Sequence, residues 1–291
     1  MASSLAQCGW ELQEPRYLDA ARRAVDFIWE HNYQAPKQLF RIWLNGEFSI
    51  PAQLEDYAHL CEALIVLFDI TAESDYLEKA AGLMQDLLEL FWNEGSGGFY
   101  LGPDHQEGPS LARSSSAVDG ATLSSYGVAV ECLALLSERR CLLDVPASAE
   151  ANGYDAHLQK AVSAASVELD EYPPSHVTLI RALKQHLEGS ISPIRYGAEG
   201  RLKLTARRNS DSQASDADSR LELKIMLSTL AGYHVTAEPG DNEQLEPLRV
   251  ELADDEQHWQ IESVDLIAAS KEKGEMDGGR YTDHWLLHIV V

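Results

Sequence analysis

Residues 54–100, LEDYAHLCEALIVLFDITAESDYLEKAAGLMQDLLELFWNEGSGGFY, decide the fold of this chain. In the first part of this stretch, apolar side chains recur three and four residues apart, which predicts a helix over about 52–69 with one buried face. The second part repeats the pattern and predicts a helix over about 74–92, with Ser74 and Asp75 where a helix cap is expected. Two such helices in series predict stacked helix pairs.

The flanking sequence predicts more helices and one β-hairpin. Helices are expected over 15–32, 122–138, 153–169 and 174–187, and prolines stand at the start of the first and the last of them. Residues 37–50 alternate apolar and polar side chains around Asn45-Gly46, which is a strong hairpin pattern. Residues 95–113 are rich in Gly and turn-forming residues, and they are expected to form a loop.

The period of the pattern changes near residue 190. From there to the C-terminus, short segments alternate apolar and polar residues between Pro, Gly and Asp, and they predict six to eight short strands. We therefore expect an α+β protein of two domains, a helical domain over 1–190 and an immunoglobulin-like antiparallel β-sandwich over 191–291. The polar segment 207–220, RRNSDSQASDADSR, is expected to be a mobile loop of the second domain.

The charge of the chain is strongly negative, because 23 basic side chains stand against 47 acidic ones and give a net charge of −24. Residues 1–190 contribute −16 of this total, from 12 basic and 28 acidic side chains. Basic residues adjoin only in short pairs such as Arg139-Arg140. Phosphate backbones and anionic lipids would be repelled, so neither a nucleic acid nor a membrane is expected as a partner.

The four cysteines, at positions 8, 61, 132 and 141, have neither CxxC nor zinc-ligand spacing, so no metal and no cofactor is expected. Cys61 and Cys132 fall on apolar helical faces and are expected to be buried thiols. The N-terminus has no signal-like pattern, and no apolar run is long enough to span a bilayer. Free cysteines without a signal predict a cytoplasmic protein.

Three motifs resemble one known family: LEDYAHL at 54–60, FWNEGSGGFY at 91–100 and DGAT at 119–122. Over roughly residues 5–189 the chain looks like the helical domain of YyaL-like proteins, the spermatogenesis-associated, thioredoxin-domain family. This resemblance implies an (α/α)6 toroid, similar to those of N-acylglucosamine 2-epimerases and six-hairpin glycosidases. The thioredoxin domain of the family is absent, and only about half of the ring's helices are expected here. The resemblance therefore implies either a fragment of a longer protein, or a half ring that forms a homo-oligomer or binds a separately encoded partner.

A second and weaker resemblance rests on GYHVTAEPG at 232–240 and the strand expected after it. This segment looks like the N-terminal immunoglobulin-like domain of DsbD-type thiol:disulfide interchange proteins. Those domains work through a cysteine pair, and residues 191–291 contain no cysteine. A direct part in disulfide exchange is therefore excluded for this domain.

Toroid enzymes that act on sugars carry carboxylates or histidines at one end of the ring, with aromatic side chains that stack on the sugar. The resemblance thus makes Asp56, His59 and Asp119 candidate catalytic residues. A carboxyl group with a raised pKa can act as an acid, and an ionised carboxylate or a neutral His can act as a base. The side chains expected to line the same rim and bind a sugar are Arg41, Tyr57, Trp92, Arg113 and Tyr126.

Each candidate also has a structural interpretation. Asp56 is favoured in the first turn of a helix by the helix dipole, and Asp119-Gly120 is typical of a turn before a helix. The Trp92 side chain can simply pack the Gly-rich turn, and Arg113 can pair with Asp119. The family typically has Pro-Ser-Gly-Asn-Ser after its DGA, whereas this chain reads DGATLSSYGVA, so Tyr126 can fill the cavity of the ring.

Three functional hypotheses stay open, and the sequence does not decide whether the chain is an enzyme. The first is a non-catalytic or degenerate interaction module. The second is a carbohydrate-binding or carbohydrate-processing protein of the epimerase or glycosidase type. The third is an accessory to thiol–disulfide chemistry that has no redox cysteine pair of its own.

Overall fold

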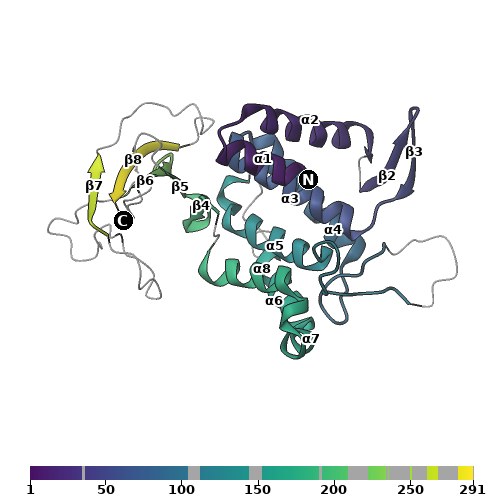
Figure 1. The fold of residues 1–291 in the computed structure, drawn as a ribbon. Helices are drawn as coiled ribbons and strands as arrows, with labels where there is room; N and C mark the ends of the chain where they lie inside the picture. The colour runs from purple at the N-terminus through teal and green to yellow at the C-terminus, as the bar shows by residue number, and fades with distance from the viewer. Residues whose placement is uncertain are drawn as a thin grey trace. The chain divides into compact units, whose positions relative to one another are not determined.

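The computed structural model describes residues 1–34, 37–103, 112–143, 153–189, 192–208, 222–233, 235, 250, 261–267 and 281–290. Helices and antiparallel sheets make up an α+β protein. The chain divides into two compact units, Met1–Ser190 and Ile191–Val291 (Figure 1). The first unit holds the helices and one small sheet, and the second holds a larger sheet.

Helices pack against one another to form the core of the first unit (Figure 1). The central helix α3 contacts α1, α4 and α5, and α5 in turn contacts α6 and α8. Both α3 and α5 are buried on nearly all sides, which suits their largely apolar sequences. The helices are α1 (Ala2–Glu11), α2 (Pro15–His31), α3 (Leu54–Thr71), α4 (Ser74–Phe91), α5 (Ser125–Glu138), α6 (Gly153–Ala164), α7 (Ser166–Glu171) and α8 (Val177–Glu188).

Helix boundaries follow local chemistry and differ in places from the sequence predictions. Helix α5 begins at Ser125 rather than near 122, because the Ser124 side chain accepts a hydrogen bond from the Gly127 N–H and caps it. Ser74 is the first residue of α4 rather than its cap, which is Glu73. The single helix expected over 153–169 is two, since α6 ends before Ala165 and α7 follows. Helix α1 was not predicted from the sequence.

A three-stranded antiparallel sheet lies beside the helices, with the strand order β1-β2-β3. Its strands are β1 (Tyr33–Gln34), β2 (Gln38–Leu44) and β3 (Glu47–Pro51). The predicted hairpin is present at Asn45-Gly46, where Leu44 pairs with Glu47 and the two loop residues take φ of 54° and 86°. Positive φ at both loop positions is what a two-residue hairpin turn requires.

The second unit contains one five-stranded antiparallel sheet among the described residues, with the strand order β4-β5-β6-β8-β7. Its core consists of Leu227, Leu287 and Ile289, with partly buried apolar side chains around them. The strands are β4 (Ile194–Gly197), β5 (Leu202–Arg208), β6 (Glu222–Leu230), β7 (Ser263–Ile267) and β8 (Tyr281–Val290). The loop expected at 207–220 falls outside the described residues after Arg208, as do most of GYHVTAEPG and the strand expected after it.

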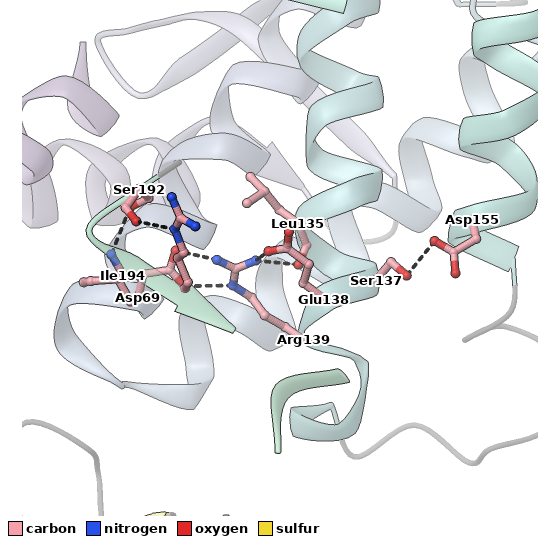
Figure 2. Close-up of polar contacts among 9 residues, drawn as sticks. Asp69, Leu135, Ser137, Glu138, Arg139, Asp155, Ser192 and Ile194 are labelled. Carbon is pink, nitrogen blue, oxygen red and sulfur yellow. Dashed lines mark hydrogen bonds and ion pairs between the residues drawn. The ribbon is translucent and has the colours of Figure 1, made fainter. Parts of the chain in front are cut away.

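A buried arginine joins two of the central helices. Arg139, just after α5, is fully buried, and its Nε and Nη2 donate to the two carboxylate oxygens of Asp69 in α3 at 2.8 and 2.7 Å (Figure 2). Its Nη1 donates to the Leu135 carbonyl at 2.6 Å and lies 3.3 Å from Glu138 Oε2. The same view shows the hydrogen bond that the Ser137 hydroxyl donates to Asp155 Oδ1 of α6, with an oxygen–oxygen distance of 2.7 Å. These contacts fix α3, α5 and α6 relative to one another.

Across the described part of the chain, none of the helices combines the length and apolar character that crossing a membrane needs.

Candidate functional site

Helix α3, the loop before α5 and the first turns of α8 line one cavity of about 500 Å³. Its ionisable side chains come from all three places: His59 from α3, Asp119 from the loop before α5, and Arg181 from α8. The other lining residues are Gly120, Ala121, Thr122, Leu123, Val177 and Thr178, so its walls are mostly small or apolar. Among the residues that the structure describes, no Phe, Tyr or Trp side chain lines this cavity.

Asp119 holds two segments of the chain together at this cavity. Its Oδ1 accepts the Ser124 N–H at 2.8 Å, and its Oδ2 accepts the Thr178 N–H at the start of α8 at 2.8 Å. The Thr178 hydroxyl also donates to Oδ1. Burial alone would raise the pKa of Asp119, but these hydrogen bonds from Thr178 and Ser124 hold it below its ordinary value. The carboxylate therefore acts as an ionised capping group rather than as a proton donor.

His59 also lines a second cavity of about 400 Å³, which α1, α2, α3 and β2 enclose. Here Arg41 of β2 forms two ion pairs. Its Nη2 lies 2.9 Å from Glu55 Oε1, and its Nε lies 3.1 Å from Asp56 Oδ2. Asp56 Oδ2 also accepts the Gln53 N–H at 2.8 Å, which completes a capping box at the start of α3. The His59 Nδ1 atom lies 3.2 Å from Glu62 Oε2.

A charged pair that was not predicted from the sequence includes Arg181, which lines the first cavity. Glu131 of α5 pairs with Arg181, and burial raises the pKa of Glu131 even though the guanidinium opposes that shift. His59 and Glu62 also act electrostatically on Glu131, so these four side chains form one electrostatic cluster. A pattern was available in the sequence, because Glu131 is the single charged residue in the apolar run 126–136.

The predicted aromatic side chains lie inside the unit rather than on a rim. Tyr57 is buried, its hydroxyl accepts the Leu39 N–H at 3.0 Å and donates to the Lys37 carbonyl at 2.8 Å, and burial raises its pKa to about 12. Trp92 is packed between Phe99 and His157. Tyr126 is buried beneath the Gly-rich turn and donates to the Ala161 carbonyl at 2.7 Å.

Gly98 of that turn makes the packing of Tyr126 possible. Its φ of +106° suits glycine, and any Cβ at this position would collide with the Tyr126 hydroxyl. Arg113 also supports the loop, since it donates to the carbonyls of Leu90 and Gly102 and lies 4.0 Å above the Tyr100 ring. These contacts give Trp92, Tyr126 and Arg113 structural roles.

The two cavities thus bring together some of the predicted residues and leave others apart. The first contains His59 and Asp119, and the second contains Arg41, Asp56 and His59. Neither of these two cavities is lined by Tyr57, Trp92, Arg113 or Tyr126. Within the described residues, His, Cys, Asp and Glu side chains nowhere gather in the threes that a metal ion would need.

The cysteines of the helical unit are free thiols, and Cys61 and Cys132 are both fully buried, as predicted. A hydrogen bond with Cys61, together with complete burial, raises the pKa of the Cys132 thiol. A buried thiol with a raised pKa is a poor nucleophile, because the thiolate is the reactive form.

Comparison with known proteins finds similarity over less than half of the chain. Human spermatogenesis-associated protein 20 is 29% identical over 142 residues, which is 46% of this chain and 18% of the relative. An uncharacterized protein of Caenorhabditis elegans is 29% identical over 125 residues, 40% of this chain and 17% of the relative. No family model matches the chain. The chain spans less than a fifth of either relative, and the matches support a relation to the spermatogenesis-associated family.

Proposed function

We propose that this chain is a non-catalytic interaction module in which the β2–β3 hairpin binds a protein partner. One observation carries the proposal: four apolar side chains of this hairpin are open to solvent, with exposed fractions of 41% for Ile42, 64% for Leu44, 45% for Phe48 and 53% for Ile50. Every residue of β3 is exposed. Figure 1 shows β2 and β3 as a long antiparallel arm beyond the end of α2.

The exposed apolar side chains of the hairpin contribute no burial free energy unless another molecule covers them. Burying one large apolar side chain stabilises a protein by about 1.5–3 kcal/mol, so four exposed ones represent a sizeable unused contribution. Exposed apolar groups on one element are candidates for a protein–protein contact, and the register places Ile42 and Leu44 on one face of this hairpin and Phe48 on the other. We infer that the helical unit is part of an α/α toroid and that the sheet unit belongs to a β-sandwich. The hairpin would then bind the partner that completes the ring.

The chemistry of the candidate residues favours a non-catalytic role. Asp56 is engaged by the cap of α3 and by Arg41, and Asp119 is held ionised by three hydrogen bonds. The aromatic side chains that would stack on a sugar are buried in the interior. Glycoside chemistry needs an acid with a raised pKa and an aromatic platform, and the described residues that line the first cavity supply neither.

The charge of the chain indicates what kind of partner fits. The helical unit carries 12 basic and 28 acidic side chains, so two copies of it repel each other over long distances. A partner with a net positive charge and an apolar patch is attracted by the same field. The proposed partner is therefore a different, basic protein rather than a second copy.

The test is site-specific photocrosslinking from position 44, followed by purification of the crosslinked protein and measurement of its affinity for the full chain. We expect the double variant Leu44→Ser/Ile50→Ser to weaken that affinity at least tenfold. The matched control Val167→Ser/Leu187→Ser removes two apolar side chains that are also exposed, on α7 and α8, and should leave it unchanged. Equal affinity for wild type and hairpin variant would refute the proposal.

A second candidate function is carbohydrate binding at the first cavity, and the specific observation in its favour is the meeting of His59, Asp119 and Arg181 at a cavity of about 500 Å³. A sugar that binds the folded chain raises its melting temperature with concentration. Thermal unfolding against a panel of mono- and oligosaccharides tests this, repeated with His59→Ala and, as a control that lines only the second of the two cavities, with Asp56→Asn. A shift that disappears in His59→Ala supports the sugar site, and no shift for any sugar argues against it.

A further inference from the structure

We infer that the partner binds by adding an extended strand to the outer edge of β3, and that this strand alternates apolar and basic residues. The inference rests on the proposed function and names the chemistry of the partner. It draws on the unpaired backbone of β3, on the order of its side chains and on the charge of the helical unit.

The outer edge of β3 is open. In the small sheet, β3 pairs with β2 on one side, and no described strand pairs with its other side. An edge strand presents a row of N–H and C=O groups that can pair with an additional strand. Extended peptides bind to many domains in this way, through main-chain hydrogen bonds.

The hairpin register shows which backbone groups point outward. The two-residue loop is closed by Leu44 and Glu47, and the residues that close such a loop form a hydrogen-bonded pair. Hydrogen-bonded and non-hydrogen-bonded pairs alternate along an antiparallel ladder, so the next pair, Trp43 with Phe48, is non-hydrogen-bonded. The N–H and C=O of Phe48 therefore point away from β2, towards the open edge, whereas those of Ser49 point towards β2.

The end of β3 sets the centre of the interaction. Ile50 has a φ of +60°, which is unusual for a β-branched residue, and Pro51 has no N–H to donate. Regular pairing cannot continue past this point. Strand addition is thus centred on Phe48, and it covers β3 from Glu47 up to Ile50.

The side chains of β3 specify the sequence of the added strand. Exposed Phe48 and Ile50 alternate with exposed Glu47 and Ser49. Side chains on neighbouring strands lie opposite one another, and apolar pairs and opposite charges both stabilise a sheet. An added strand with apolar residues beside Phe48 and lysine or arginine beside Glu47 satisfies both conditions, and its positive charge suits the net −16 of residues 1–190.

The experiment uses the full chain and a fluorescent, end-capped heptapeptide of alternating lysine and valine as the probe. Fluorescence anisotropy should show saturable binding. The variant Phe48→Pro removes the outward N–H and should weaken binding at least tenfold. Its matched control Phe48→Ala loses the same aromatic side chain but keeps the N–H, and should weaken binding no more than threefold. A heptapeptide of alternating lysine and serine has the same charge and should bind at least tenfold more weakly.

Hydrogen exchange on the wild-type chain gives a second measurement that needs no substitution. Binding of the lysine–valine peptide should slow exchange of the Phe48 amide, while the amides of α4 exchange as before. This readout remains valid if Phe48→Pro unfolds the hairpin, which circular dichroism and thermal unfolding would show.

Three results would overturn the inference. One is equal binding of the serine peptide, which would mean that charge alone attracts the probe. Another is equal affinity of Phe48→Pro and Phe48→Ala with no protection of the Phe48 amide. The third is a stable dimer of the chain at low salt that Phe48→Pro dissociates, since the edge would then belong to a second copy. If Leu44→Ser/Ile50→Ser abolishes binding of the crosslinked partner and the peptide still fails to bind, strand addition is wrong and the proposed function stands.

Discussion

Asp119 shows at the scale of one residue how a carboxylate can serve the fold instead of catalysis. It accepts hydrogen bonds from Ser124 and Thr178 and so connects the start of α5 to the start of α8. The substitution Asp119→Ala removes a cap for two helices at once. We expect it to lower the free energy of unfolding by about 1–2 kcal/mol at pH 7, as measured by urea denaturation.

The same residue gives a pH dependence with a definite sign. Because the folded-state pKa of Asp119 lies below its unfolded value, its contribution is fully present above the unfolded pKa and is lost as the pH falls through the folded pKa. The stability difference between wild type and Asp119→Ala should therefore shrink as the pH is lowered below about 4, the ordinary pKa of an aspartate. A difference that stays constant down to pH 2 would show that the ionised carboxylate is not the stabilising form.

Residue type and spacing revealed the candidate residues, but not what each side chain contacts. The DGAT motif marked Asp119, yet its main partner Thr178 lies 59 residues further along the chain, and no local pattern connects the two. The aromatic rings of Trp92 and Tyr126 pack around the Gly-rich turn that contains Gly98. From the sequence alone, this packing role and a sugar-binding role were both open. Glu131 was the exception, because a lone charge in an apolar helix is visible in the sequence.

The contact between α3 and α5 depends on the buried Arg139. Its guanidinium neutralises Asp69, and it opposes the effect of burial, which raises the pKa of the neighbouring Glu138. Replacing Arg139 with Met would leave two buried carboxyl groups without their cation. We expect a loss of about 3–5 kcal/mol in the free energy of unfolding, measured by chemical denaturation at pH 7.

A double variant separates the charge from the packing. Because Arg139→Met/Asp69→Leu removes the ion pair as a whole, it should recover much of the stability lost in Arg139→Met. If the double variant were as unstable as the single one, the packing of the arginine side chain, not its charge, would hold α3 against α5.

At the scale of elements, the periodicity of apolar residues predicted the helices and strands that bury an apolar stripe, and it missed the helix that does not. Helices α3, α4 and α5 and the hairpin at Asn45-Gly46 lie close to their predicted positions. Helix α1 was missed because its buried residues are Ser3, Ala6 and Gly9, which are too small to give an apolar signal. Gly9 packs directly against the backbone of Leu18 in α2, so close contact takes the place of hydrophobic bulk. The break at Ala165 between α6 and α7 also has no local marker such as Gly or Pro.

On the scale of the whole molecule, the exposed hairpin and the net charge of −24 act against each other. The apolar side chains of the hairpin favour association with any similar surface, including that of a second copy. The negative charge opposes the binding of a second copy. The range of this repulsion, the Debye length, falls as salt is added, from about 10 Å at 0.1 M to about 3 Å at 1 M. High salt also strengthens hydrophobic association when the salt is a sulfate.

These opposing effects predict a dimer that forms only when charge is screened. In sedimentation velocity at micromolar concentration, the chain should be a monomer at 20 mM NaCl and should self-associate measurably in 0.5 M sodium sulfate. The variant Leu44→Ser/Ile50→Ser should remain a monomer in both, while Val167→Ser/Leu187→Ser should behave as wild type. Dimers already present at low salt would show that the charge does not keep copies apart, and the hairpin would then have to be assigned to self-association. Association at high salt by the hairpin variant as well would place the apolar contact elsewhere on the molecule.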